Sequence, residues 1–196
     1  PQIDNGYDVA DYCAINPDYG TMADFERLVE QAHQRGMRIV MDMVFNHTST
    51  QHPWFVAAQD PANEKHHFYI WRDGKADALP NNWRSKFGGD AWQWSESADQ
   101  YYLHLFAPEQ ADLNWEHPPV REALKSVCHF WADKGVDGLR LDVINLVSKQ
   151  QDFPDDLQGD GRRFYTDGPR IHEFLGEFGR DVFKPRGLMT VGEMSS

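Results

Sequence analysis

The pattern of apolar and polar positions repeats three times along the chain: a segment with helical periodicity ends near a glycine, and a short apolar run then ends in an acid. In the first repeat, Thr21 and Asp24 have the spacing of a capping box, which predicts the start of a helix. The apolar positions that follow at helical spacing are Phe25, Leu28, Val29 and Ala32. Gly36 is suited to end this helix, and the run 37–41 then leads to Asp42.

The other two repeats lie towards the end of the chain. In the second, Gly135 ends the helix, residues 136–141 are predicted to form a strand, and Asp142 follows. In the third, the apolar run 188–191 is followed closely by Glu193. The apolar helical positions are Val120, Leu124, Val127 and Trp131 in the second repeat, and Ile171, Phe174, Leu175, Phe178 and Val182 in the third.

Helices and strands therefore alternate, and the strands are nearly continuous apolar runs. Such runs are typical of parallel strands that are buried on both faces, which indicates an α/β fold. In a β/α barrel the active site lies at the C-terminal ends of the strands. One strand-end acid most often caps a helix or solvates a loop. Three in equivalent places favour a shared pocket for Asp42, Asp142 and Glu193.

The segment 46–117 separates the first two repeats and contains six of the seven tryptophans. A loop of this length is uncommon unless it is functional or folds as a small domain. We therefore expect an inserted irregular domain over 46–117, between α/β parts at 1–45 and 118–196. Its aromatic residues could stack on sugars, but a unit this small also needs bulky side chains for its own core.

Composition excludes several classes of function. The chain has 196 residues and a formal net charge of −12, which argues against a nucleic-acid partner because phosphate binding needs clustered Lys and Arg. No apolar run of about 18 residues occurs, so no transmembrane span is expected. Cys13 and Cys128 are too few for a disulfide framework or a metal site. Two free thiols favour a reducing compartment, the cytoplasm.

Two carboxylates in different environments are what glycoside hydrolysis requires. Arg140 lies two residues before Asp142, on the same side of the strand, and is expected to lower the pKa of Asp142 and keep it ionised. Glu193 follows an apolar run without an adjacent basic residue, so partial desolvation is expected to favour its protonated form. These environments suit a nucleophile and a general acid.

A metal hydrolase is the competing class of enzyme. No H-E-x-x-H motif occurs, and the adjacent His66 and His67 would point apart in a strand, so no metal site is expected. His47 lies five residues after Asp42 and could donate a hydrogen bond to a sugar hydroxyl, although a lone histidine is more often structural.

Five motifs, in this order, resemble those of the α-amylase family of glycoside hydrolases and its oligo-1,6-glucosidase subgroup. They are residues 5–8, 42–48, 110–115, 138–142 and 191–193. The resemblance implies a retaining α-glucosidase with a partial (β/α)8 TIM barrel, about strands three to five, and an inserted domain B. Residues 1–45 would hold the loop after strand two, helix two and strand three. Residues 118–196 would hold helix three to strand five.

The resemblance also implies roles for single residues. Asp142 would be the nucleophile and Glu193 the general acid/base. The expected sugar contacts are Asp8, His47, Phe106 and Arg140, and the expected supporting residues are Asp42 and Tyr7. Asn46 matches a calcium ligand of true amylases, but the subgroup often lacks this calcium, so neither a metal nor a cofactor is expected.

The substrate implied by the resemblance is trehalose-6-phosphate, hydrolysed to glucose and glucose-6-phosphate. The stretches similar to family members with this activity are residues 82–89, 159–168 and 186–193. Val143, directly after the nucleophile, is the residue that relatives with α-1,6 and trehalose-type substrates tend to have. Arg84 and Lys86 are the candidates for phosphate binding, with Arg162 and Arg163 in a second loop. The alternative is an oligo-1,6-glucosidase acting on isomaltose and short dextrins.

The family's fourth signature, with a third catalytic aspartate, does not occur in the sequence. We therefore expect an internal fragment of a longer enzyme, inactive by itself. A non-catalytic glucosidase-like domain, such as the heavy subunit of an amino-acid transporter, is an alternative of another class. Those domains lose catalytic acids, whereas Arg140, Asp142 and Glu193 are all present here.

Overall fold

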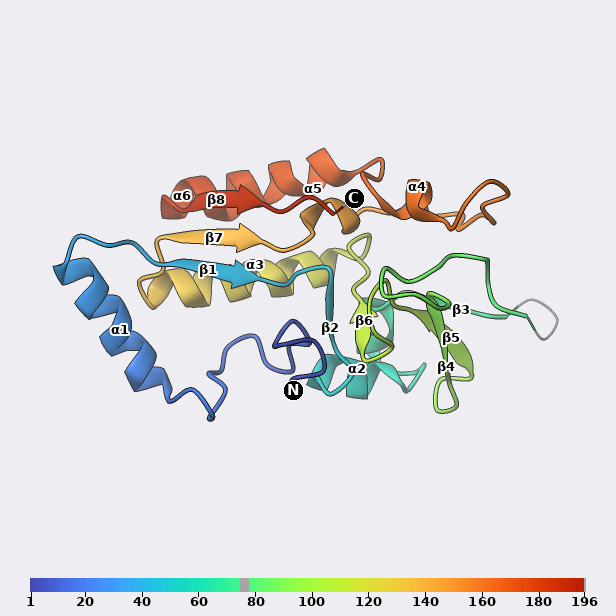
Figure 1. Ribbon diagram of the computed structural model, residues 1–196, viewed down its shortest axis with the longest axis horizontal. Coiled ribbons are helices and arrows are strands. Elements are labelled where there is room, and N and C mark those ends of the chain that lie inside the picture. Colours follow the sequence, from blue (N-terminus) through green and yellow to red (C-terminus); the bar gives the residue numbers. More distant parts are fainter. Residues whose placement is uncertain (75–77, 196) are drawn as a thin grey trace.

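The computed structural model describes residues 1–74 and 78–195. Its parallel sheet has the strand order β1-β7-β8 and consists of β1 (Val40–Met43), β7 (Gly138–Leu141) and β8 (Met189–Gly192). The helices that precede these strands are α1 (Met22–Gln34), α3 (Pro118–Asp133) and α5 (Ile171–Phe178) (Figure 1). The predicted alternation of helix and strand is therefore confirmed.

Local sequence signals explain the helix boundaries. Thr21 and Asp24 form the predicted capping box, in which the Asp24 N–H donates to the Thr21 hydroxyl over 3.2 Å and the Thr21 N–H donates to the Asp24 carboxylate over 2.9 Å. Gly36 and Gly135 follow α1 and α3 with positive φ, the conformation that glycine adopts without strain. After α5 the chain continues as a π-helical turn (Gly179–Phe183) and the short α6 (Lys184–Arg186).

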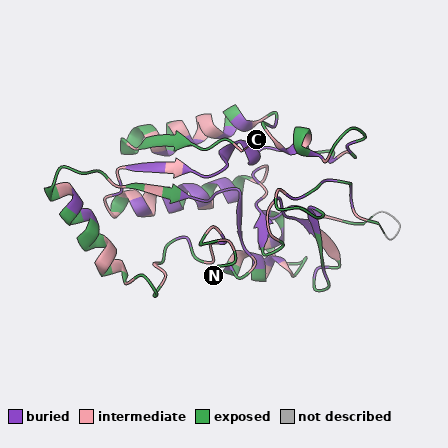
Figure 2. Cartoon of the chain, viewed as in Figure 1, coloured by how far each residue is buried: buried purple, intermediate pink, exposed green. Residues whose placement is uncertain are grey.

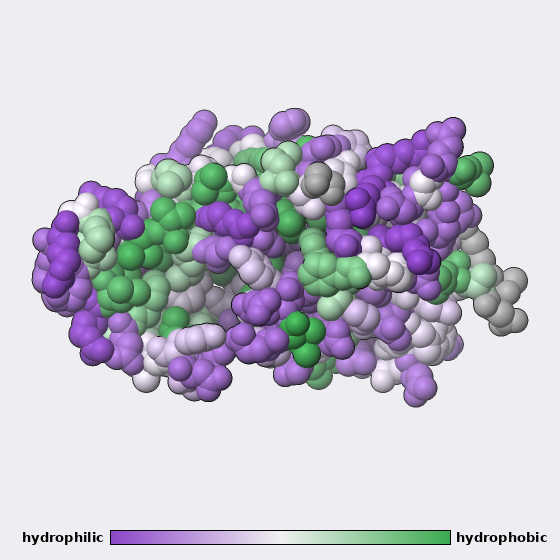
Figure 3. All heavy atoms as spheres, viewed as in Figure 1, coloured by the Kyte–Doolittle hydropathy of each residue, from purple (hydrophilic) through white to green (hydrophobic). Residues whose placement is uncertain are grey.

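The predicted apolar face of α3 is buried, and that of α5 is buried except for the partly buried Leu175, whereas burial differs among the three parallel strands. Only β7, the central strand, is largely buried, while β8 is exposed at all four positions. Val40, Met189 and Val191 are 42–53% exposed because β1 and β8 are the outer strands of this sheet. Apolar side chains accordingly gather over the sheet region of the surface in Figure 3.

The segment between β1 and α3 forms small antiparallel sheets of its own. One pairs β2 (His47–Ser49) with β6 (Gln110–Asp112), and the other has β5 (Gln100–Leu103) between β3 (Trp71–Arg72) and β4 (Trp92–Ser95). The helices here are α2 (Pro53–Ala58) and a 3₁₀ helix, Glu64–Phe68. Four of the six tryptophans in this segment are buried, namely Trp71, Trp83, Trp92 and Trp115, so they form part of its core. The strands β2 and β6 are buried at every position (Figure 2).

The chain after β7 packs back onto this inserted segment. It forms a 3₁₀ turn (Ile144–Leu146) and the short α4 (Arg162–Tyr165), and the Tyr165 hydroxyl donates to the Arg84 carbonyl over 3.0 Å. Phe153 and Tyr165 surround the fully buried Trp83. Within residues 1–74 and 78–195, none of the helices is long and apolar enough to span a membrane.

Candidate active site

The three strand-end acids meet around the guanidinium of Arg140. Its Nη1 atom lies 2.7 Å and 2.8 Å from the two carboxylate oxygens of Asp42 and 2.5 Å from Oδ1 of Asp142. Its Nη2 atom lies 2.7 Å from Oε2 of Glu193. The register explains this meeting, because Asp42 pairs with Arg140 across β1 and β7, and the other two acids directly follow β7 and β8. The structure thus brings together the acids that the repeats predicted to share a pocket.

Backbone hydrogen bonds continue the parallel sheet by one residue and fix both acids that follow strands. The Asp142 N–H donates to the Met43 carbonyl over 3.0 Å, and the Glu193 N–H donates to the Leu141 carbonyl over 2.9 Å. Tyr7 contacts two members of the cluster. Its hydroxyl donates to Asp42 over 3.2 Å, and its ring centroid lies 5.9 Å from the Arg140 guanidinium. Tyr7 is therefore positioned to support Asp42.

The electrostatics of Asp142 correct the expectation from sequence. Its burial and its hydrogen bond with the Glu193 carboxyl raise the pKa of Asp142 to about 7, and Arg140 opposes this only in part. Arg140 was expected to lower this pKa, but one guanidinium is shared among three carboxyl groups. The Glu193 side chain is 45% exposed. The cluster therefore favours the protonated form of Asp142.

His47 and Phe106 lie together, but His47 is enclosed by protein. It is 1% exposed, its Nε2 atom lies 3.1 Å from both the Tyr7 carbonyl and the Gln110 amide nitrogen, and its ring centroid is 5.1 Å from that of Phe106. Burial lowers the pKa of His47, so the ring is neutral at pH 7. A sugar contact through Nε2 requires one of these protein partners to give way.

Asp8 lies apart from the acids in the part of the chain that the structure describes. It is fully buried, and its two carboxylate oxygens accept the backbone N–H groups of Ile3 and Asp4 over 3.1 Å and 3.2 Å. A sugar contact through Asp8 requires the preceding loop to release this carboxylate. These contacts could not be predicted from the sequence, since backbone donors carry no residue identity.

Lys149 contacts Asn46, the residue that matches a calcium ligand of true amylases. Its ammonium is 2.9 Å from the Asp112 carboxylate and donates to the Asn46 side-chain oxygen over 3.1 Å and to the Leu146 carbonyl over 2.6 Å. Lys149 and Asp112 are 1% and 0% exposed. Sequence analysis missed Lys149 because its partners are distant in the chain. Among residues 1–74 and 78–195, no group of three or more His, Cys, Asp or Glu is arranged to hold a metal ion.

The two basic loops also come together, but their arginines pair with acids. Arg84 is 2.9 Å from Asp90, while Arg162 and Arg163 pair with Asp160 and Asp156 over 3.1 Å and 2.7 Å. Lys86 lies 5.6 Å from the centroid of the Tyr165 ring, and its pKa is lowered by burial and by the nearby Arg162. Lys86 therefore lies between the two loops, near both Arg162 and Asp160.

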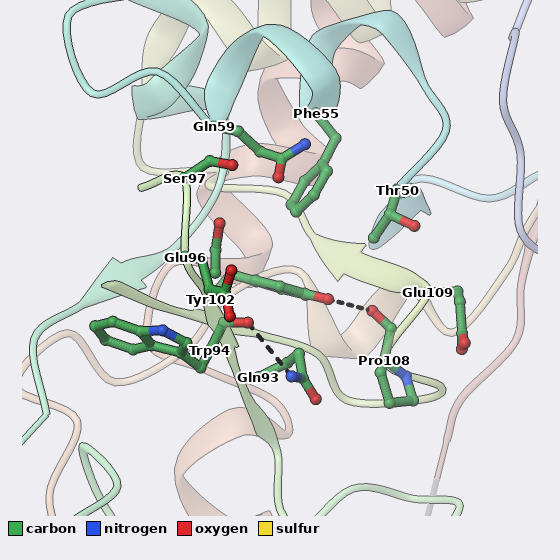
Figure 4. Close-up of a pocket in the computed structure, with 11 residues that line it drawn as sticks. Thr50, Phe55, Gln59, Gln93, Trp94, Glu96, Ser97, Tyr102, Pro108 and Glu109 are labelled. Carbon is green, nitrogen blue, oxygen red and sulfur yellow. Dashed lines mark hydrogen bonds between the residues drawn. The ribbon is translucent and has the colours of Figure 1, made fainter. Parts of the chain in front are cut away.

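A hollow of about 690 Å³ lies elsewhere, between α2 and the strands β4 and β5 (Figure 4). Phe55, Gln59, Trp94 and Tyr102 line it, and the Tyr102 hydroxyl donates to the Pro108 carbonyl over 2.8 Å at its edge. None of the predicted site residues lines this hollow. The acid cluster is therefore a separate feature, open to solvent through the exposed side chains of Asp42 and Glu193.

Comparison with known proteins agrees with the resemblance seen in the motifs. The family described as "Alpha amylase, catalytic domain" matches residues 1–196. The chain belongs to this family. Its fold is accordingly that of the family's catalytic domain, which is of the TIM-barrel type.

Individual members of the α-amylase family are also highly similar to the chain. It is 70% identical over 196 residues to the trehalose-6-phosphate hydrolase of Escherichia coli (strain K12), and 48% identical over 200 residues to an oligo-1,6-glucosidase of Parageobacillus thermoglucosidasius. The crystal structure of the Bacillus licheniformis trehalose-6-phosphate hydrolase superimposes with a TM-score of 0.98 at 59% identity. The match covers 98–100% of this chain but 36% of each of these relatives.

Proposed function

We propose that the chain carries the nucleophile and the general acid/base of a retaining α-glucosidase that hydrolyses trehalose-6-phosphate to glucose and glucose-6-phosphate. The observation that carries this proposal is the meeting of Asp42, Asp142 and Glu193 on Arg140 at adjacent strand ends. The 70% identity to the Escherichia coli hydrolase supports the choice of substrate. The free thiols Cys13 and Cys128 suit a cytoplasmic enzyme.

In the proposed reaction, the Asp142 carboxylate attacks the anomeric carbon while Glu193 donates its proton to the glycosidic oxygen. Glucose-6-phosphate leaves, and glucose remains bound to Asp142 as an ester. Glu193 then takes a proton from water, which releases glucose and regenerates both acids. The geometry supports this division, because Asp142 and Glu193 follow neighbouring strands and both contact Arg140, which places them beside one glycosidic bond.

The place of the chain in a complete barrel is part of the same proposal. We assign β1, β7 and β8 to barrel strands three, four and five, and residues 46–117 to domain B, between barrel parts at 1–45 and 118–196. The parallel order of the three strands and the separate antiparallel sheets of the insert support this division. Because the chain spans 36% of these relatives, we expect it to be inactive without the rest of the barrel wall.

The sugar contacts follow from the neighbourhood of Arg140. We propose that Arg140, His47 and Phe106 contact the glucose that Asp142 attacks, and that Tyr7 and Asp42 hold Arg140 in place. Asp8 would join them only after releasing the N–H groups of Ile3 and Asp4.

The proposed phosphate site is the loop that carries Arg84 and Lys86. Phe87 in this loop lies 5.4 Å from Phe106, ring centroid to centroid, so the loop borders the proposed sugar pocket. Arg84 pairs with Asp90 over 2.9 Å, so a phosphate contact through Arg84 requires this ion pair to open.

The substrate is tested by comparing kcat/KM of the full-length enzyme for trehalose-6-phosphate, trehalose and isomaltose. We expect the phosphorylated sugar to give the highest value, because a charge-assisted contact to phosphate contributes about 1.5–3 kcal/mol. A higher value for isomaltose would replace this proposal with an oligo-1,6-glucosidase, the alternative favoured by the 48% identity to that enzyme.

The phosphate site is tested with the double variant Arg84→Gln/Lys86→Gln. We expect KM for trehalose-6-phosphate to rise about ten- to a hundredfold, and KM for isomaltose to stay unchanged. Arg27→Gln/Arg35→Gln, in α1 and at its C-cap, removes the same charge away from the acids and serves as the control. An unchanged KM for the phosphorylated sugar would assign its phosphate to other residues.

A further inference from the structure

The segment after Glu193 is held by the residues that directly follow Asp142. The Val143 N–H lies 3.3 Å from Oε2 of Glu193, and the Ile144 N–H donates to the Glu193 carbonyl over 3.1 Å. These contacts begin where the pairing of β7 with β8 ends, at Leu141 and Gly192. The loops after the two strands therefore stay attached to each other beyond the sheet.

Asn145 makes the last and most specific contact of this series. Its side-chain amide donates to the Ser195 carbonyl over 3.0 Å and accepts the Ser195 N–H over 2.8 Å. The side chain is buried, with Asn145 2% exposed, and its own carbonyl accepts the Asp167 N–H over 2.9 Å. A backbone hydrogen bond from the α4–α5 connection thus holds Asn145, and its side chain binds the main chain at Ser195, two residues after Glu193.

The backbone between Asp142 and Asn145 has an unusual conformation that makes this contact possible. Val143 has φ 37° and ψ 41°, in the left-handed region that β-branched residues rarely adopt. Its side chain is held in a buried cluster with Leu146 and Phe153. Gly192 allows the close approach, since a Cβ there would lie 3.1 Å from Ile144. A strained turn and a glycine thus bring the two loops together.

We propose that Asn145 is a positioning residue, which fixes Glu193 opposite Asp142 by holding Ser195. The inference rests on the proposed function, because it concerns the distance between the two acids of a retaining glycosidase. That distance is about 5–5.5 Å in such enzymes, and a displacement of about 1 Å can reduce the rate about a hundredfold. Asn145 is suited to this role because Ser195 lies two residues after Glu193 and makes both hydrogen bonds with the buried amide.

The test compares two substrates in the full-length enzyme carrying Asn145→Ala. Trehalose-6-phosphate needs protonation of its leaving oxygen by Glu193, whereas a 4-nitrophenyl α-glucoside does not, and added azide replaces the water that Glu193 activates. We expect kcat for trehalose-6-phosphate to fall about a hundredfold with little change in KM. With the nitrophenyl glucoside and azide, kcat should fall less than about fivefold.

Asn82 provides a matched control, because its amide grips the main chain of Asp156 with the same two hydrogen bonds, of 2.8 Å and 2.7 Å, away from the acids. Asn82→Ala should leave the ratio between the two substrates unchanged. Asn145→Asp keeps the shape of the side chain and should show the same selective loss if Asn145→Ala does not fold. Equal losses on both substrates, or no loss, would overturn the inference. A wild-type enzyme inactive on every glucoside would instead overturn the proposed function.

Discussion

Two of the centres in which a cation meets carboxylates, those of Arg140 and Lys149, differ in charge balance and burial. At the first, Arg140 contacts Asp42, Asp142 and Glu193, and its side chain is 26% exposed. At the second, Lys149 pairs with Asp112, and both side chains are buried, at 1% and 0% exposed. The first centre has three acids for one cation, whereas the second pairs one with one and adds the neutral Asn46.

The difference in charge balance distinguishes a centre suited to acid–base chemistry from a pair that stabilises the fold. A balanced pair with its hydrogen bonds satisfied stays ionised and inert, although it depends on both partners. At the Arg140 centre, burial and then the neighbouring carboxyl groups raise the pKa of Asp142 to about 7 despite the contact with Arg140. Sites with such unequal carboxyl groups are the ones that perform acid–base chemistry.

The largest expected effect would confirm that the Arg140 centre is catalytic. In the full-length enzyme, Asp142→Asn should lower kcat by about four orders of magnitude or more, because no nucleophile remains. Glu193→Gln should lower it about 10²- to 10⁴-fold, and azide or a good leaving group should restore activity in part. Steady-state kinetics measures both changes. Azide rescue of Asp142→Asn but not of Glu193→Gln would reverse the two roles.

The second effect concerns the contribution of the Lys149–Asp112 pair to the stability of the folded protein. Lys149→Met leaves the Asp112 carboxylate buried without its cation and should lower the free energy of unfolding by about 3–5 kcal/mol. Thermal unfolding of the full-length enzyme detects this as a lower Tm. The double variant Lys149→Met/Asp112→Asn should recover part of the loss, since the buried charge is gone. A Tm unchanged by the single variant would show that the pair contributes nothing.

The smallest expected effect is a gain in stability, caused by a substitution at the Arg140 centre. The raised pKa of Asp142 means that folding favours its protonated form, so this contribution to stability is present below pH ~4 and is lost as the pH rises through about 7. Asn mimics the protonated acid. Asp142→Asn should therefore be more stable than the wild type at pH 8 by about 1–3 kcal/mol, and equal to it near pH 4. A variant less stable at pH 8 would contradict the assigned direction.

Periodicity and glycine placement predicted the helices that precede the parallel strands and the alternation of helix and strand. The capping box at Thr21 and Asp24 and the buried face of α3 depend on neighbours in the sequence, and both are present. The strand boundaries were less accurate, since β1 includes Asp42 where a strand ending at residue 41 was expected. Short apolar runs do not encode which residues pair, because pairing depends on the partner strand.

By itself, the sequence determined which residues could meet: three acids after three apolar runs converge in any parallel α/β arrangement, since strand ends share one edge. Only the tertiary structure decided their electrostatic state and their surroundings. Burial and the Glu193 contact outweigh Arg140 at Asp142, Lys149 fills the place beside Asn46, and backbone donors occupy Asp8. The reason is physical: periodicity is local in the chain, whereas charge balance and desolvation sum over neighbours from distant segments.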